Sequence, residues 1–144
     1  LRPVFLTVMH GGLIFAGQLA PRLSFDCDFD YIHATRYRGD TSGGQLIWLA
    51  EPRLSLEGRT VLLVDDILDE GITLRAIRDW CLDQGAATAV VVVLTLKEHD
   101  RCHPDIEADY CGLVVPDRYV FGFGMDYQGR GRNLPGIWAL KEAS

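Results

Sequence analysis

The stretch VLLVDDILDEGITL, Val61–Leu74, decides the fold. It begins within Thr60–Val64, a β-branched and leucine run that is typical of a strand buried on both faces of a parallel sheet. A helix is expected over Thr73–Gln84, followed by a second buried strand over Ala89–Leu96. The apolar residues of the expected helix recur at three- and four-residue spacing: Leu74, Ile77, Trp80 and Cys81. Strand, helix and strand in this order predict a parallel βαβ unit with a right-handed crossover.

The rest of the chain extends this unit without a linker, a repeat or a low-complexity tract, so we expect one domain over residues 1–144. A short helix is expected at Leu13–Ala20. Further strands are expected at Pro3–Met9, Phe29–Tyr37, Gln45–Leu49, Tyr110–Val115, Tyr119–Phe123 and Ile137–Leu140. The predicted fold class is α/β, with a mostly parallel central sheet flanked by helices. In such sheets ligands bind at the carboxyl ends of the strands.

The composition of the chain argues against several classes of protein. The 144 residues are 48% hydrophobic and carry a net charge of -6, which argues against a membrane-spanning chain, a disordered chain or a broad nucleic-acid-binding face. Four cysteines without a CxxC pair indicate a reduced, cytoplasmic protein. The chain starts at Leu1 and enters a strand at once, so we expect that it lacks its natural N-terminal segment.

Acidic residues crowd the turn that follows Val64. These residues and their small neighbours are Asp65, Asp66, Asp69, Glu70, Gly71 and Thr73. Neighbouring carboxylates oppose one another's ionisation, and favourable helix-dipole interactions would explain only Asp69 and Glu70. Adjacent strand residues point to opposite faces, so the Asp pair can flank a ribose and accept hydrogen bonds from two hydroxyls. The free N–H groups of the following helix suit a monophosphate. The turn therefore predicts a site for a ribose 5-phosphate; the alternative is a well-capped helix.

At this point the sequence resembles a known family. Val61–Leu74 is similar to the phosphoribosyl-pyrophosphate (PRPP) motif of type I phosphoribosyltransferases, and other segments resemble the hypoxanthine-guanine branch. Met9–Gly12 resembles its pyrophosphate loop, and Thr35–Tyr37 with Arg38–Gly44 resembles its mobile catalytic loop. Lys97 resembles the lysine that reads the base, and Pro116–Gly136 resembles the segment that binds purine and pyrophosphate.

The resemblance implies a purine salvage enzyme. It would transfer the 5-phosphoribosyl group of PRPP to N9 of hypoxanthine or guanine, and release IMP or GMP with pyrophosphate. It also implies a small hood over the purine, Mg²⁺ as cofactor and a homodimer or homotetramer. The net charge argues against nucleic acid as a partner, and the short apolar runs argue against a membrane. A cis peptide bond between Met9 and His10 is implied as well.

Individual roles follow from the same resemblance. Asp65 and Asp66 would bind the ribose hydroxyls. The 5′-phosphate would be held by Asp69, Glu70, Gly71, Ile72 and Thr73. Asp69 would accept the proton at purine N7, and Tyr37 would shield the reaction from water within a lid over Arg36–Gly44. Pyrophosphate would be bound by His10, Gly11 and Arg132, purine by Lys97, Tyr119, Val120 and Asp126, and Mg²⁺ by Asp65, Asp66 and Asp126.

Three residues depart from the common family motif. His10 and Ile72 stand where lysine is frequent, and Glu70 replaces a usual threonine, which puts ligand affinity in doubt more than the class of reaction. Taken singly, Lys97 could be a solvated strand end, Tyr119 a core aromatic and Arg132 part of a basic turn.

Other functions stay open. The chain could prefer xanthine or adenine, or could be a catalytically weak regulator that binds PRPP or nucleotides. A zinc site at His99, Cys102 and His103 is conceivable, but we expect a polar surface turn there, since Pro104 cuts short any helix and no fourth ligand is evident nearby.

Overall fold

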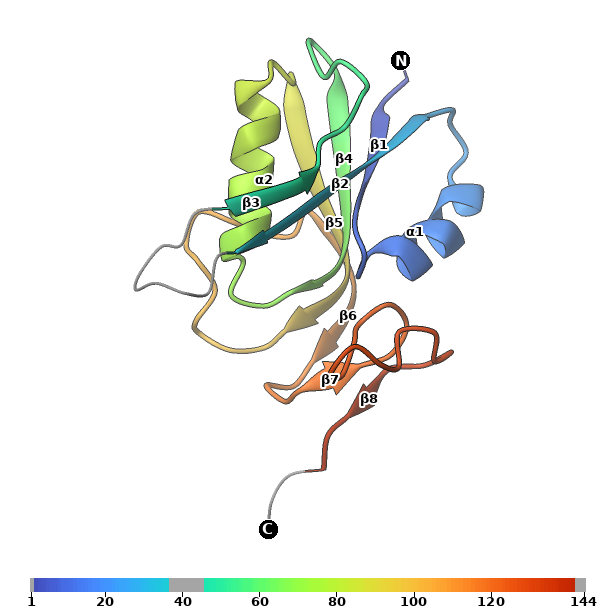
Figure 1. Ribbon diagram of the computed structural model, residues 1–144, viewed down its shortest axis with the longest axis vertical. Coiled ribbons are helices and arrows are strands. Elements are labelled where there is room, and N and C mark those ends of the chain that lie inside the picture. The colour runs from blue at the N-terminus through green and yellow to red at the C-terminus, as the bar shows by residue number, and fades with distance from the viewer. Residues whose placement is uncertain (1, 37–45, 142–144) are drawn as a thin grey trace.

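A six-stranded sheet forms the centre of the computed structural model, which describes residues 2–36 and 46–141 (Figure 1). The strands lie in the order β3-β2-β1-β4-β5-β6. Their bounds are β1 Val4–Val8, β2 Asp28–Arg36, β3 Leu46–Ala50, β4 Thr60–Leu68, β5 Thr88–Lys97 and β6 Tyr110–Val115. Neighbouring strands run parallel except β2 and β3. The predicted α/β class with a mostly parallel sheet is confirmed.

Two helices pack on opposite faces of this sheet (Figure 1). Helix α2, Ile72–Asp83, buries Leu74, Ile77 and Cys81 against the main core. Helix α1, Leu13–Leu19, buries Ala16 in a smaller cluster with Phe5 and Val64, and a 3₁₀ turn, η1, follows at Ala20–Arg22. The helical spacing of apolar residues therefore matches the faces that are covered.

The two faces are not covered equally. On the α2 face of β4, Val61 and Leu63 are fully buried, whereas Leu62 on the α1 face is only half-buried. The expectation that Thr60–Val64 and Ala89–Leu96 are buried on both faces is therefore only partly met. The physical reason is size, because the seven residues of α1 cannot cover a six-stranded sheet.

Strand β4 continues four residues past Val64, and this places the acidic pair inside the strand. The extension is stabilised by pairing with β5, where Ile67 lies opposite Thr95 and Leu68 opposite Leu96. After a short turn, α2 begins at Ile72 with Gly71 as its N-cap at φ +79, a left-handed conformation that favours glycine.

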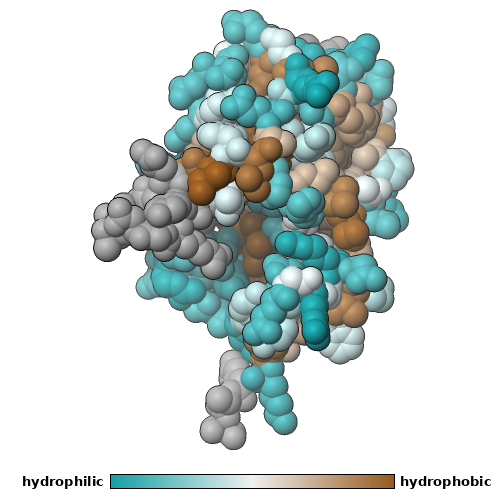
Figure 2. All heavy atoms as spheres, viewed as in Figure 1, coloured by the Kyte–Doolittle hydropathy of each residue, from teal (hydrophilic) through white to brown (hydrophobic). Residues whose placement is uncertain are grey.

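A separate small sheet lies beyond the carboxyl ends of the main strands (Figure 1). It pairs β7, Val120–Phe121, with β8, Trp138–Ala139, in antiparallel fashion. Both strands are shorter than the sequence predicts. This sheet and the segments beside it, residues 116–139, correspond to the predicted hood and are called the hood below. Figure 2 shows a recess with apolar atoms at its bottom between this part and the main sheet. Within the described ranges, no helix is long and apolar enough to cross a membrane.

Candidate active site

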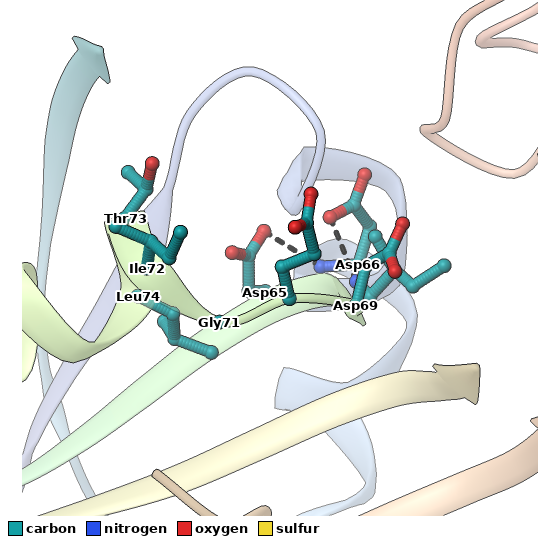
Figure 3. Close-up of a pocket in the computed structure, with 9 residues that line it drawn as sticks. Asp65, Asp66, Asp69, Gly71, Ile72, Thr73 and Leu74 are labelled. Atoms are coloured by element: carbon teal, nitrogen blue, oxygen red, sulfur yellow. Dashed lines mark hydrogen bonds between the residues drawn. The ribbon is translucent and has the colours of Figure 1, made fainter. Parts of the chain in front are cut away.

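Two cavities meet at the carboxyl end of β4. The first has a volume of about 430 Å³ and is lined by Asp65, Asp66, Ile67, Asp69, Glu70, Gly71, Ile72, Thr73 and Leu74 (Figure 3). The second has a volume of about 170 Å³ and is lined by Asp66, Ile67, Asp69, Lys97, Tyr119, Val120, Met125 and Asp126. Asp66, Ile67 and Asp69 line both cavities and form a shared wall. A ligand with two parts can therefore be held on either side of this wall.

The first cavity presents acceptors from β4. Asp65 Oδ1 accepts the Asp66 N–H at 2.8 Å, and Asp66 Oδ1 accepts the Ile67 N–H at 2.7 Å (Figure 3). Burial and the neighbouring Asp66 carboxylate raise the pKa of Asp65 well above its ordinary value. Each side chain uses one oxygen in these bonds, and its second oxygen can accept from a sugar hydroxyl.

The beginning of α2 completes this cavity. The first N–H groups of a helix have no partner within the helix. No side chain caps α2, and its first turn contains no acidic residue, so no side chain of the helix itself occupies these N–H groups. Gly71, Ile72 and Thr73 all line the cavity, and Thr73 adds a hydroxyl (Figure 3). This arrangement suits a monophosphate.

Asp69 lies two residues before the N-cap, outside the first turn of α2. Its carboxylate is held from the end of β5: Lys97 Nζ lies 3.0 Å from Oδ2, and His99 Nε2 lies 2.5 Å from Oδ1. Burial alone would raise the pKa of Asp69, but the hydrogen bonds from His99 and Lys97 outweigh burial and lower it. A carboxylate that stays ionised can accept a proton from a ligand.

His99 was missed as a site residue. The surface turn expected at His99, Cys102 and His103 is wrong for His99, whose side chain is only 3% exposed. Its contact with Asp69 joins residues 30 positions apart. The available signal was its position directly after the carboxyl end of a strand adjacent to β4.

The second cavity combines a cation with an aromatic wall. Lys97 enters it from the end of β5, and Tyr119 and Val120 enter it from the hood. The Tyr119 hydroxyl donates to the Asp126 carbonyl at 2.9 Å, and its ring packs edge-on against Tyr127 while staying half exposed. Tyr119 is thus a fixed ring at the cavity rather than a core aromatic, and it suits stacking on a flat ligand.

The residues expected at the pyrophosphate end lie around the loop after β1. The Met9–His10 peptide bond is cis, as the resemblance implies. A Cβ at Gly11 would collide with the Asp66 carboxylate, so a larger residue here would displace this carboxylate from its observed position. Arg132 reaches the same region from the hood: its Nη1 donates to the Gly124 carbonyl at 2.7 Å.

His33 on β2 is a second residue that the sequence did not single out. Its ring contacts that of His10 edge-on, with centroids 4.5 Å apart. Burial and the nearby charges of His10 and Arg132 lower the pKa of His33. Since β1 and β2 are parallel neighbours, residues near their carboxyl ends share one edge of the sheet. His10, His33 and Arg132 therefore form a cationic or proton-accepting group that suits an anion.

The candidate metal ligands do not form one cluster. Within residues 2–36 and 46–141, no group of three or more His, Cys, Asp or Glu side chains is arranged to hold a metal ion. Asp66 and Asp126 line the second cavity together, whereas Asp65 lines only the first. Mg²⁺ commonly binds through one or two carboxylates plus substrate phosphates, so Asp66 and Asp126 fit such an ion. Tyr37 and the expected lid 38–44 lie outside the described residues.

An acceptor pair for a sugar, a helix end for its phosphate and an adjoining cavity for a base define a nucleotide-handling site. The chain belongs to the phosphoribosyl transferase family, whose domain model matches residues 2–130.

Within that family it resembles the hypoxanthine-guanine members. It is 36% identical over 141 residues to the hypoxanthine-guanine-xanthine phosphoribosyltransferase of Tritrichomonas foetus, covering 98% of this chain and 77% of that one. It is 33% identical to the hypoxanthine-guanine phosphoribosyltransferase of Streptococcus pneumoniae, covering 97% of this chain and 78% of that one. It superposes with a TM-score of 0.89 and 31% identity on the hypoxanthine phosphoribosyltransferase of Trypanosoma cruzi in complex with the product IMP, covering 98% and 76%.

Proposed function

We propose that this protein is a purine salvage enzyme that transfers the 5-phosphoribosyl group of PRPP to N9 of hypoxanthine or guanine. The products are IMP or GMP and pyrophosphate. The observation that carries the proposal is the wall of Asp66, Ile67 and Asp69 between the two cavities. A ribose 5-phosphate in the larger cavity and a base in the smaller one would meet at this wall, where the new bond must form.

The sugar phosphate is held by the first cavity. Asp65 and Asp66 accept from the 2′- and 3′-hydroxyls, and the main-chain N–H groups from Asp69 to Thr73 with the Thr73 hydroxyl bind the 5′-phosphate. Glu70 and Ile72 contribute through their main chain, so their departure from the family motif is tolerated. Fixing the sugar in this way places its anomeric carbon beside the base.

The base is held by the second cavity. Tyr119 stacks on its ring, the main chain of Val120 meets its edge, and Lys97 donates to purine O6. Adenine carries an amine at that position, which donates instead of accepting, and so it is disfavoured.

Asp69 accepts the proton. In the transfer, the bond from C1′ to the pyrophosphate oxygen breaks, the bond from C1′ to N9 forms, and the proton on purine N7 passes to the Asp69 carboxylate. The lowered pKa of Asp69 keeps this carboxylate ionised before the base arrives.

The leaving group departs toward the loop after β1. His10, the Gly11 amide and Arg132 bind pyrophosphate there, and the ring of His33 contacts that of His10. Bound Mg²⁺, held by Asp66 and Asp126, would neutralise charge on the pyrophosphate oxygens. Tyr37 and the loop that follows it would exclude water.

The test is a steady-state assay of pyrophosphate release with PRPP, Mg²⁺ and each of hypoxanthine, guanine, xanthine and adenine. Release that requires a 6-oxopurine supports the proposal. Release without any base, or no release together with no heat of GMP binding in calorimetry, would refute it.

Xanthine is a second candidate substrate, because the name of the Tritrichomonas foetus relative includes it. Competition among the purines in the same assay separates the two. We further propose that the protein is cytoplasmic and forms a homodimer or a homotetramer. Light scattering of the purified protein measures its molar mass and so distinguishes the two oligomers.

A further inference from the structure

The buried imidazole of His99 makes a hydrogen bond at each of its ring nitrogens. Nε2 lies 2.5 Å from Asp69 Oδ1, and Nδ1 accepts the N–H of Arg101 at 2.9 Å. His99 follows β5 and is outside the group of residues that line either cavity. His99 can therefore act on the site through its contact with Asp69 and not by binding a ligand directly.

These two contacts fix the tautomer of the ring. A main-chain N–H can only donate, so Nδ1 must present its lone pair to Arg101. A hydrogen bond between Nε2 and a carboxylate oxygen requires one proton between them, and the lowered pKa of Asp69 leaves that carboxylate ionised. The proton therefore sits on Nε2, which donates to Asp69.

The segment that sets this tautomer is itself anchored. The Arg101 guanidinium makes two hydrogen bonds to the Asp117 carboxylate, at 2.7 and 2.8 Å. This contact ties the turn after β5 to the beginning of the hood. Asp117, Arg101, His99 and Asp69 thus form a continuous chain of contacts that ends at the shared wall.

We propose that His99 is a positioning residue for Asp69: its Nε2–H holds one oxygen of the carboxylate in place while the other faces Lys97. The proposal rests on the proposed role of Asp69 as proton acceptor. When Lys97 donates to purine O6, its attraction for Asp69 weakens, and His99 is the partner that remains. The carboxylate then keeps its orientation toward N7 during the transfer.

The charged groups near His99 are Asp69 and Lys97 in the site and the Arg101–Asp117 pair beyond it. Hydrogen bonding from Arg101 lowers the pKa of Asp117 to about 2. Loss of the His99 donor removes one of the two hydrogen bonds that lower the pKa of Asp69. The acid limb of a kcat–pH profile must then move to higher pH.

The experiment compares His99→Leu, which removes the donor, with His99→Gln, which can restore one near the Nε2 position. We expect His99→Leu to lower kcat about tenfold, to leave KM for PRPP within about twofold, and to move the acid limb to higher pH. His99→Gln should recover most of the loss. An unchanged kcat and acid limb in folded His99→Leu would overturn the proposal.

His103 supplies the matched control. Its Nδ1 also accepts an N–H two residues ahead, that of Asp105, at 3.1 Å. His103→Leu removes this similar local contact without touching the His99–Asp69 hydrogen bond, so it should keep both kcat and the pH profile. If it reproduces the His99→Leu profile, the effect belongs to the turn as a whole and the proposal fails.

A measurement independent of turnover separates this proposal from the proposed function. In ¹⁵N-histidine-labelled protein, NMR should find the His99 proton on Nε2, displaced downfield by its carboxylate partner, and moved upfield in Asp69→Asn. A proton on Nδ1 overturns the positioning role even in an active enzyme. An inactive protein with the expected resonance refutes the phosphoribosyl transfer and leaves the Asp69–His99 contact established.

Discussion

Lys97 Nζ lies 3.0 Å from Asp69 Oδ2, so the cation proposed to bind the base is already paired with the carboxylate proposed to take its proton. The Lys97 side chain is only 12% exposed, whereas Asp69 is 39% exposed. An incoming purine therefore meets Asp69 first and must share the ammonium with it. Because an ammonium has three donors, Lys97 has N–H groups available for purine O6, and its contact with Asp69 Oδ2 weakens as it shares its charge with the base.

Removing this ammonium should damage selectivity. Lys97→Ala is expected to reduce the preference for 6-oxopurines over adenine by about 10- to 100-fold, since a hydrogen bond from a charged group contributes about 1.5–3 kcal/mol. Competition assays with the four purines measure it. The chain's other lysine, Lys141, is the matched control, and Lys141→Ala should keep the preference. An intact preference in Lys97→Ala would refute the assignment.

Asp69→Asn tests the proton acceptor. Asparagine keeps the size and a carbonyl oxygen but cannot take the proton, so kcat should fall about 100-fold or more. The dissociation constant of PRPP, measured by calorimetry, should change by no more than about threefold. Asp83→Asn, at the exposed end of α2, should leave both values as they are. Equal losses in turnover and in PRPP binding would contradict the role of Asp69.

Gly11 and Gly17 give a contrasting pair of glycine substitutions. A methyl group at Gly11 collides with the Asp66 carboxylate, so Gly11→Ala should abolish the rise in melting temperature that GMP causes in the parent protein. Gly17 lies inside α1 with nothing within 4 Å of the added carbon. Gly17→Ala should therefore stabilise the fold by about 0.5–1 kcal/mol and keep the response to GMP. If Gly11→Ala binds GMP normally, the close approach has no functional role.

Pyrophosphate binding should strengthen as the pH falls. Burial, His10 and Arg132 lower the pKa of His33, so this ring is neutral at pH 7, and a bound polyanion favours its protonated form. Proton uptake then accompanies binding until the pH falls below the pKa of free His33, where the gain levels off. Calorimetry of pyrophosphate with Mg²⁺ from pH 8 to pH 5 measures the slope. His33→Asn should flatten it, with the ligand's own titration common to both proteins; equal slopes would exclude His33.

The central βαβ unit could be predicted from sequence because its signals are local. The apolar runs and the spacing of Leu74, Ile77 and Cys81 define the strands and helix wherever they pack. The end of β4 could not be predicted, since its last residues are held by pairing with β5, and a ladder partner is not visible in a local pattern. The incomplete cover of the α1 face could not be predicted either, because the number of strands beneath this seven-residue helix depends on the sheet order and not on a local pattern.

The candidate site was also predicted where its signals are local and missed where they depend on distant residues. The acidic turn could be predicted because four carboxylates within six residues are costly without a ligand. The contacts of Asp69 with Lys97 and His99 could not, because these residues lie at and just after the end of β5, about thirty residues away, and only the sheet order brings them together. His33 escaped notice for a similar reason, since its neighbour His10 belongs to a different strand end.

The wall shared by the two cavities divides recognition between parts of the chain. Strand β4 and the start of α2 supply nearly all of the larger cavity, whereas Tyr119, Val120, Met125 and Asp126 belong to the hood. A chimera that receives residues 116–136 from a relative should thus inherit the donor's preference among 6-oxopurines, while Lys97 on β5 keeps the selection against adenine and β4 with α2 keeps the binding of the sugar phosphate. The preference for a nucleobase can therefore change through the hood while the residues that bind the sugar phosphate stay the same.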